Sequence, residues 1–416
     1  MKKIIIIGGG AAGWLTALTL NKVYENSNIS LIESSKIGIL GAGEGSTPNF
    51  GSFLSKLGIN HDDFFNETKA TVKNGLHMQN WTGDNANLYH MFTGESPTIT
   101  DKIKNFAYHF DAVLVAKFFK KIAIERGVNW VDGEVSKINN LNENITSIEL
   151  KNGNIIELDL IFDCSGFNRL ILNTINNQEW ESYSEYLLTN SAFGFFLPPK
   201  NKYTINDNTK TKVIAMNCGW MFDIPLQHRH GCGYVFNDNY ISVEDAKKEV
   251  EDYLGHEIKI QKVFNFNPGT FKRSWVGNSI SIGLAYSFIE PLEATSLMTT
   301  IMQLKKLIDI NFNEEYKENY NTFCYETNEQ NSLFIRYHYL NEKLDTPFWK
   351  DAYNMPIQPK LKKIIDDNNY PIPTNGAELA EMMELKEFHH TQLPFAVNNY
   401  RTIYVKNKKS LKKEII

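Results

Sequence analysis

The N-terminal part of the chain combines a continuous apolar run with a helical pattern. Ile4–Ile7 is an unbroken β-branched run, which is typical of a strand buried on both faces. Trp14, Leu15 and Leu18 then recur at helical spacing, and Ile29–Ile32 forms a second apolar run. This strand–helix–strand order predicts an α/β fold with a parallel sheet at its start.

The rest of the chain divides into a strand-rich stretch and a helical one. Asp111 is placed to cap a helix that ends at Gly127. Apolar and polar residues alternate, with turn signals between them, from about residue 183 to residue 266, which predicts a β-rich part. From Gly283 to Tyr339 the pattern is mainly helical.

Three glycines follow the first strand in the pattern G-x-G-x-x-G. Gly8 allows a tight turn, Gly10 lets a pyrophosphate approach the backbone, and Gly13 lets the helix pack close to the strand. The N–H groups at the start of the helix, at Ala11 and Ala12, would face the phosphates. The turn therefore predicts a dinucleotide site.

Two further features support this site. Glu33 ends the second predicted strand, 20 residues after Gly13, where an acid can bind an adenosine ribose. A third buried strand leads into the turn Asp163–Gly166, and in flavoproteins with this fold the chain returns to the cofactor at such a turn. The sequence has no second G-x-G-x-x-G for NAD(P)H, so we expect the electrons to come from a separate source.

Composition and charge narrow the range of partners. The formal net charge of −5 favours neither a nucleic-acid nor an acidic-membrane partner. The sequence lacks a signal peptide and an apolar stretch of about 20 residues, so we expect no membrane span. None of the four cysteines forms a CxxC pair, which argues against a metal site or a disulfide framework and favours the cytoplasm.

Several motifs resemble the flavin-dependent tryptophan halogenase family. They appear in the family's order, which makes a chance match implausible, and they run from residue 4 to about residue 350. They are GGGAAGW at the first turn, Gly43–Pro48, Gly219–Pro225 with Phe222 in place of a second Trp, Gly231–Phe236, Gly283–Ala285, Glu290–Ser296, and His338–Tyr339 followed by Asp345–Trp349.

The resemblance implies an FAD-binding dinucleotide fold of the flavoprotein monooxygenase type. Residues 1–180 would form the first FAD-binding segment, with a substrate-side insertion at about 60–105. Residues 181–270 would form the β-rich substrate part, and residues 271–330 the second FAD-binding segment. Residues 331–416 would be mainly helical.

The implied chemistry is halogenation of an electron-rich aromatic compound. Reduced FAD, supplied by a separate flavin reductase, reacts with oxygen and with chloride or bromide to give hypohalous acid. The backbone at Thr295 and Ser296 would hold the halide, and Glu293 would stabilise the cationic ring and accept its proton, or else only cap its loop. The implied flavin contacts are Gly8, Gly10, Ala11, Ala12, Gly13, Glu33, Ser34, Ile37, Glu44, Gly45, Val135, Leu284 and Leu297.

One position departs from the family pattern. The family's active-site lysine is expected four residues before a tryptophan, and here His77 lies four residues before Trp81. Lys73 corresponds to another family lysine. It lies four residues before His77, which is about 13 Å along an extended strand. Three interpretations of His77 are open. His77 would position the hypohalous acid, or it would be a structural histidine in a chain that has lost halogenation. In the third, the enzyme would carry out another flavin chemistry such as hydroxylation.

The substrate is the least defined feature. The chain between Trp81 and Phe110 is short, without the insertion that covers indole in tryptophan-selective members. A larger or carrier-held aromatic is therefore as plausible as free tryptophan. A homodimer is also compatible with the sequence, whereas a non-catalytic flavin-binding protein fits less well because the Glu293 loop is intact.

Overall fold

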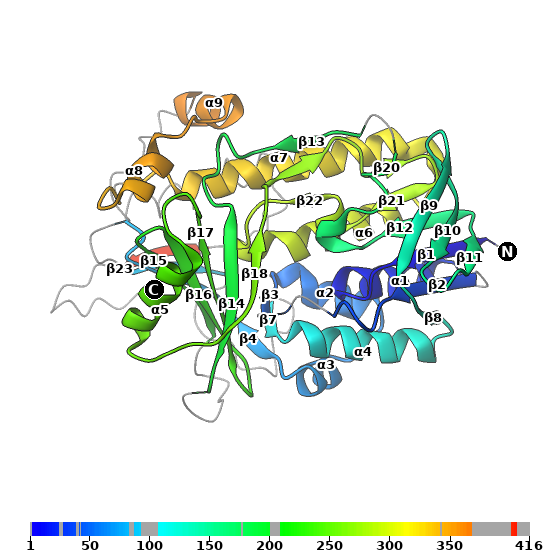
Figure 1. The fold of residues 1–416 in the computed structure, drawn as a ribbon, viewed down its shortest axis with the longest axis horizontal. Coiled ribbons are helices and arrows are strands. Elements are labelled where there is room, and N and C mark those ends of the chain that lie inside the picture. The colour runs from blue at the N-terminus through cyan, green and yellow to red at the C-terminus, as the bar shows by residue number, and fades with distance from the viewer. Residues whose placement is uncertain are drawn as a thin grey trace.

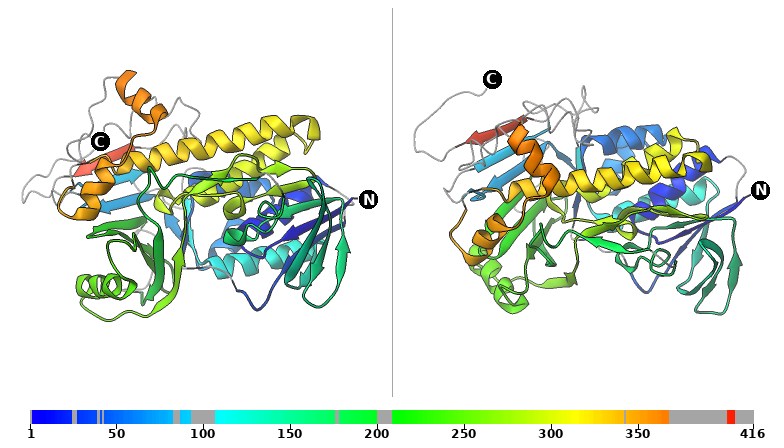
Figure 2. Two further views of the ribbon diagram at one scale, coloured as in Figure 1. Left: turned by 45° about the horizontal axis from the view of Figure 1, so that its top comes forward. Right: turned by 90° about the horizontal axis from the view of Figure 1, so that it is seen from above.

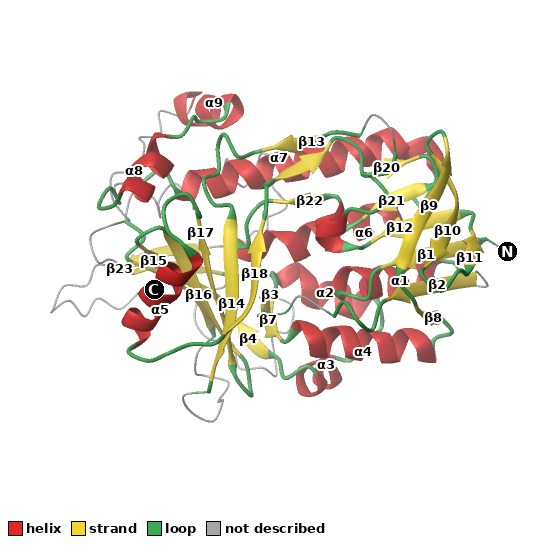
Figure 3. Ribbon diagram, viewed as in Figure 1, coloured by secondary structure: helices red, strands yellow, loops and turns green. Residues whose placement is uncertain are grey.

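The computed structural model describes residues 2–24, 28–38, 41, 43–82, 87–92, 107–175, 178–199, 209–341, 343–367 and 401–405. Figures 1 and 3 place its two large sheets toward opposite ends of the long axis, with the N-terminus at the end of the first sheet. Among these residues, no helix is long and apolar enough to cross a membrane.

The first large sheet has six strands, and all of its pairs are parallel except the one at the β20 edge. Its central strand is the isoleucine run at the start of the chain, whose four isoleucines are at most 4% exposed. The order is β20 (Trp275–Val276), β21 (Ser279–Ser281), β12 (Leu160–Asp163), β1 (Lys3–Ile7), β2 (Asn28–Glu33) and β8 (Asn129–Asp132). The predicted parallel α/β start is confirmed.

The second large sheet has eight strands and mixes distant parts of the chain. Two of them, β5 and β6, come from the predicted insertion at 60–105, and they join strands of the predicted β-rich part. The order is β18 (Ile260–Asn265), β14 (Ser191–Leu197), β17 (His230–Phe236), β16 (Gly219–Pro225), β15 (Lys210–Met216), β5 (Gly75–Gln79), β6 (Asn87–Met91) and β23 (Arg401–Val405).

The described residues form three small sheets as well. The first contains β11 (Ile155–Glu157), β10 (Asn144–Leu150) and β9 (Val135–Leu141), and the second contains β13 (Trp180–Ser182), β19 (Gly269–Phe271) and β22 (Ser287–Phe288). The third contains β3 (Glu44–Gly45), β7 (Ala107–Phe110) and β4 (Thr71–Lys73). The third sheet is the important one for function, because it brings the Gly43–Pro48 loop beside Lys73.

Helices cover the sheets and link them. The expected cap at Asp111 is confirmed, since its carboxylate accepts hydrogen bonds from the N–H groups of Val113 and Leu114. The α-helices are α1 (Ala11–Val23), α2 (Pro48–Lys56), α3 (His61–Glu67), α4 (Ala112–Glu125), α5 (Val243–Leu254), α6 (Thr295–Asp309), α7 (Lys317–His338), α8 (Pro347–Asn354) and α9 (Pro359–Asp367). Short 3-10 turns are η1 (Gly166–Asn168), η2 (Gly283–Ala285), η3 (Leu292–Ala294) and η4 (Glu314–Tyr316).

Two expectations need correction. The predicted β-rich part contains α5, because Val243–Leu254 is an amphipathic segment capped by Ser242 and ended by Gly255 in the left-handed conformation. The predicted helical part from residue 331 includes α8 and α9, but Arg401–Val405 forms an edge strand on β6. Residues 368–400 and 406–416 of that part lie outside the described residues.

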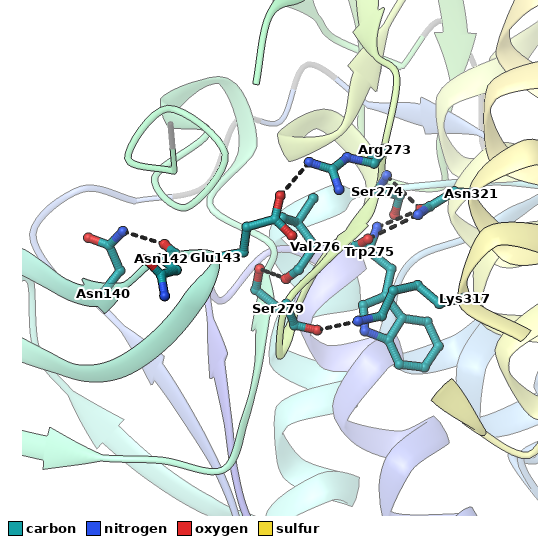
Figure 4. A network of polar contacts seen from close by, with 11 residues as sticks. Asn140, Asn142, Glu143, Arg273, Ser274, Trp275, Val276, Ser279, Lys317 and Asn321 are labelled. Carbon is teal, nitrogen blue, oxygen red and sulfur yellow. Dashed lines mark hydrogen bonds and ion pairs between the residues drawn. The ribbon is translucent and has the colours of Figure 1, made fainter. Parts of the chain in front are cut away.

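Helix α7 spans both halves of the molecule (Figures 1 and 2). Its 22 residues correspond to about 33 Å. At its start, the buried Asn321 accepts hydrogen bonds from the backbone N–H groups of Ser274 and Trp275 and donates one to the Trp275 carbonyl (Figure 4). Lys317 also donates to the carbonyl of Gly277. These bonds fix α7 to the edge of the six-stranded sheet, and thereby fix where its far end lies.

The substitution Asn321→Leu should therefore lower the free energy of unfolding by about 2–4 kcal/mol, because it leaves buried N–H and C=O groups unpaired. Urea denaturation would measure the loss. The matched control is Asn140→Ala, since Asn140 is exposed and its amide only donates to the Asn142 carbonyl (Figure 4). Equal losses for the two variants would contradict this anchoring role.

Candidate active site

The turn between β1 and α1 requires glycine at two positions. Gly8 has a φ of +113°, and a Cβ there would lie 2.2 Å from the carbonyl oxygen of Cys164 on the neighbouring strand. A Cβ at Gly13 would lie 1.8 Å from the Gly8 carbonyl oxygen. Gly10 is different, because a Cβ there would meet no described protein atom within 4 Å. The close packing thus surrounds Gly8 and Gly13, and Gly10 faces open space.

The start of α1 is suited to bind an anion. Gly10 is its N-cap, no side chain caps the first turn, and no acidic residue lies in that turn. The N–H groups around Ala11 and Ala12 and the positive end of the helix dipole are therefore available to phosphate oxygens. These features fit the pyrophosphate of FAD.

Of the predicted ribose and flavin-side residues, Glu33 lies beside this turn. Glu33 ends β2 beside Gly9, and its Oε1 accepts a hydrogen bond from Lys120, 2.5 Å away. The Ser34 hydroxyl accepts a hydrogen bond from the Lys36 N–H, Ile37 is 58% exposed, and Val135 begins β9.

Residues from the second half of the chain complete the same region. A Cβ at Gly283 would lie 3.3 Å from the Cβ of Ala12, so the turn that carries Leu284 is next to the start of α1. Leu297 is partly buried against the same hydrophobic core. Thr47, which follows the Glu44–Gly45 strand, has a buried hydroxyl without a hydrogen-bond partner among the described residues. This unpaired polar atom and the open glycine turn both fit a polar cofactor.

Lys73 lies beside the Glu44–Gly45 strand. Its side chain is buried, and a Cβ on Gly45 would lie 3.0 Å from its Nζ. The Nζ is 5.3 Å from the ring centroid of Phe92. Burial lowers the pKa of Lys73 to about 8, although the charge of Glu293 acts in the opposite direction. Lys73 thus connects the Glu44–Gly45 strand with the Glu293 loop.

Glu293 is held in an unusual backbone conformation. Its φ is +65° and that of Ala294 is +58°, so two consecutive non-glycine residues adopt the left-handed region just before α6. Such conformations cost about 1–3 kcal/mol each and persist only where the surroundings enforce them. The strain fixes a buried carboxylate at the N-terminus of α6.

Two histidines hold this carboxylate. His90 Nδ1 lies 2.9 Å from Glu293 Oε1, and His338 Nε2 lies 3.3 Å from the same oxygen. All three side chains are at most 4% exposed. Burial alone would raise the pKa of Glu293, but His90 and His338 together lower it well below its usual range. The surroundings of Glu293 thus favour its ionised form.

The predicted halide residues begin α6 directly after Glu293. The N-cap of α6, Ala294, makes no side-chain cap, and the Thr295 and Ser296 carbonyls accept hydrogen bonds from Thr299 and Thr300. The backbone N–H groups at this helix start can accommodate a halide ion.

A second buried carboxylate, Glu290, lies near this site. It accepts hydrogen bonds from the hydroxyls of Thr189 and Tyr339, and burial raises its pKa to about 7. Tyr339 in turn accepts a hydrogen bond from the indole of Trp220 in the Gly219–Pro225 motif. The network links that motif to the end of α7.

Comparison with known proteins identifies the family of this chain. The family described as tryptophan halogenase matches residues 3–101 and 95–408. The chain belongs to the tryptophan halogenase family. The tryptophan 7-halogenase RebH of Lentzea aerocolonigenes is 29% identical over 430 residues, which cover 88% of this chain and 81% of that protein.

Solved structures agree with this assignment. The flavin-dependent halogenase Xcc4156 of Xanthomonas campestris has a TM-score of 0.81 and 27% identity, and the match covers 88% of this chain and 83% of that one. BrvH, a flavin-dependent halogenase from Brevundimonas sp. BAL3, has a TM-score of 0.79 and 25% identity over 88% of this chain and 84% of its own. The protein is thus a flavin-dependent halogenase, an oxidoreductase, and the FAD fold expected from the sequence is confirmed.

Of the roles left open for His77, the sheet register favours the structural one over replacement of the active-site lysine. His90, which contacts Glu293, pairs directly with Leu76 across β5 and β6. Paired residues point to the same face of a sheet and adjacent residues to opposite faces, so His77 points away from Glu293. Its Nε2 bonds to Asn87, 2.7 Å away. Lys73, on a different strand, is buried and interacts electrostatically with Glu293.

Three residues around Glu293, namely Lys73, His90 and His338, receive no catalytic role from the sequence pattern. One extended strand from Lys73 to Trp81 is the simplest interpretation of the sequence, but Gly75, with a φ of +149°, separates β4 and β5 into different sheets. His338 was part of a recognised motif but received no role, and His90 carried no local signal. Among the described residues, no group of His, Cys, Asp and Glu could hold a metal ion.

The glycine turn gives a direct test of the cofactor site of the halogenase. Gly10→Ala should leave the fold intact and weaken FAD binding by about tenfold or more, because its new methyl group would occupy the space used by the pyrophosphate. Gly8→Ala should reduce both stability and FAD binding, because it collides with the backbone of Cys164. Thermal melting and flavin fluorescence titration separate these effects, and unchanged FAD affinity in Gly10→Ala would place the phosphates elsewhere.

Proposed function

We propose that this halogenase uses reduced FAD, oxygen and chloride or bromide to form hypohalous acid, which then halogenates an electron-rich aromatic compound. Bound FAD would supply the electrons that activate oxygen and allow the halide to be oxidised. The observation that carries the proposal is the buried pair Lys73 and Glu293, beside the predicted flavin strand at Gly45 and the predicted halide residues Thr295 and Ser296.

Lys73 would position the hypohalous acid. A buried ammonium donates hydrogen bonds to the oxygen of that acid and polarises the oxygen–halogen bond toward the aromatic ring. When the halogen is transferred, the same ammonium can donate a proton to the departing hydroxide, which leaves as water. A pKa of about 8 suits this exchange, because the lysine is mostly protonated at neutral pH and yields its proton readily.

Glu293 would complete the substitution. The attacked ring becomes cationic, and a fixed carboxylate stabilises that charge and accepts the proton from the halogenated carbon. The balanced reaction converts an aromatic C–H and hypohalous acid into an aromatic carbon–halogen bond and water. Because the pKa of Glu293 is depressed, its basic form is present throughout the neutral pH range.

The substrate class follows from the surroundings of Glu293. Phe92 and Phe334 lie near the His90 ring, with centroid distances of 6.5 Å and 6.3 Å, so flat apolar surfaces border the carboxylate. We propose an indole- or phenol-like substrate. The related RebH is named for tryptophan, but the short segment between Trp81 and Phe110 favours a larger or carrier-held aromatic.

Three further expectations belong to this proposal. A separate flavin reductase would supply reduced FAD, since the sequence has one dinucleotide turn. A cytoplasmic location fits four cysteines that are all free thiols. A homodimer stays a prediction from the sequence.

Bromide incorporation tests the function. The flavin-loaded protein, supplied with reduced FAD, oxygen, bromide and a panel of indoles and phenols, should give products with the bromine isotope pattern in mass spectra. Omitting bromide should abolish them. Hydroxylated products that do not depend on bromide, or no product from a flavin-loaded protein across a broad panel, would contradict the halogenase proposal.

Paired substitutions test the assignment of the active-site cation. Lys73→Met should lower bromination by about 10²–10³-fold, because it removes the group that polarises the hypohalous acid, while FAD remains bound. His77→Phe should change the rate by about twofold at most, since His77 lies on the other sheet face. The reverse pattern, with His77→Phe inactive and Lys73→Met active, would restore the interpretation made from the sequence.

A further inference from the structure

The end of α7 places His338 in a position where its protonation state is restricted. His338 Nδ1 lies 2.8 Å from the backbone carbonyl oxygen of Phe334, and His338 Nε2 lies 3.3 Å from Glu293 Oε1. A carbonyl oxygen can only accept a hydrogen bond, so Nδ1 must carry a proton. The remaining nitrogen, Nε2, therefore faces the carboxylate with either a second proton or a lone pair.

Electrostatics decides between these two forms. A neutral His338 would direct a lone pair at an anionic oxygen inside a buried site, where repulsion is strong. Only two arrangements avoid this: an imidazolium facing a carboxylate, or a neutral imidazole that accepts a proton from a carboxylic acid. In both, one proton is shared between His338 Nε2 and Glu293 Oε1.

The other neighbours favour the charged pair. Lys73, on β4, acts electrostatically on Glu293, and His90 Nδ1 also lies against Glu293 Oε1. Two positive or proton-donating groups around one oxygen stabilise its ionised form. Glu290, the other acid near His338, is held by the hydroxyls of Thr189 and Tyr339.

We propose that His338 is a positioning residue for halogenation, and this proposal rests on the proposed function. Its imidazolium keeps Glu293 ionised and holds Glu293 Oε1, so that Glu293 Oε2 is presented to the aromatic ring. His338 does not itself touch the substrate in this arrangement. Both histidine contacts of Glu293 among the described residues use Oε1, which leaves the second oxygen for the reacting carbon.

Deprotonation of the ring is an acid–base step in this arrangement. The C–H bond at the halogenated carbon breaks, its electron pair restores the aromatic ring, and the proton passes to Glu293 Oε2. No group is oxidised or reduced in this step. The resulting neutral acid faces an imidazolium that favours the carboxylate, so the proton is released to water as the product leaves. His338 remains protonated throughout.

Nitrogen-15 NMR of the flavin-loaded full-length chain, labelled at histidine, reads the protonation of His338 directly and does not depend on halogenation. His338→Gln identifies the signal by its loss. The proposal expects both ring nitrogens of His338 to carry protons at pH 7. An unprotonated Nε2 at that pH would overturn it.

Kinetics provide a second readout that a purely structural role would not move. In His338→Phe, bromination in a single turnover should slow by about 10–100-fold, and the isotope effect with ring-deuterated substrate should exceed that of the wild type, because deprotonation becomes limiting. The acid limb of the rate profile should move up by about 1–3 pH units as Glu293 loses the neighbouring cation. His338→Gln keeps a neutral hydrogen-bond donor, so its rate and pH profile should lie between those of the wild type and of His338→Phe.

The matched control is His230→Phe. His230 Nδ1 lies 2.6 Å from Asp223 Oδ1, so this variant breaks another largely buried histidine–carboxylate pair away from Glu293. It should leave the isotope effect and the pH profile unchanged. The proposal would be overturned if folded, flavin-loaded His338→Phe had the same isotope effect and the same pH profile as the wild type. If the wild type itself fails to brominate, the proposed function fails, and the NMR result still decides the state of His338.

Discussion

The arrangement of the site depends on keeping the buried carboxylate of Glu293 ionised. Removing the charge of Glu293 from water costs several kcal/mol unless opposite charges and hydrogen bonds compensate. That compensation comes from Lys73 on β4, His90 on β6 and His338 on α7, which belong to three distant segments. The loop itself is strained at Glu293 and Ala294, so the cost of forming the site is distributed over the surrounding fold.

The architecture explains how these groups meet. The small sheet of β3, β4 and β7 carries Lys73 next to the Glu44–Gly45 strand, and the eight-stranded sheet carries His90. Helix α7 is fixed at its start to the six-stranded sheet by Asn321 and delivers His338 at its end. One helix therefore links the edge of the six-stranded sheet to the Glu293 carboxylate.

Local features could be predicted well from the sequence. The turn at Gly8, the cap at Asp111 and the motif around Glu293 each depend on a few adjacent residues, and each lies where it was expected. The choice among the roles of His77 depends on tertiary structure, because the break at Gly75 puts Lys73 in another sheet and the register with β6 puts His77 on the face away from His90. Sequence patterns report such breaks poorly, since strand pairing is decided by tertiary contacts.

His90 and His338 could not have been assigned from the sequence for a related reason. Their contact with Glu293 joins residues 203 and 45 positions apart. Nothing in the local pattern of either histidine distinguishes a carboxylate partner from an ordinary core position. Only the packing of β6 and α7 against the Glu293 loop makes them part of the site.

Infrared difference spectroscopy measures the charge state of Glu293 most directly. The flavin-loaded protein is compared with its Glu293→Gln variant at pH 7. We expect the difference spectrum to show the antisymmetric stretch of a carboxylate. The carbonyl stretch of a protonated carboxylic acid at that position would contradict the account.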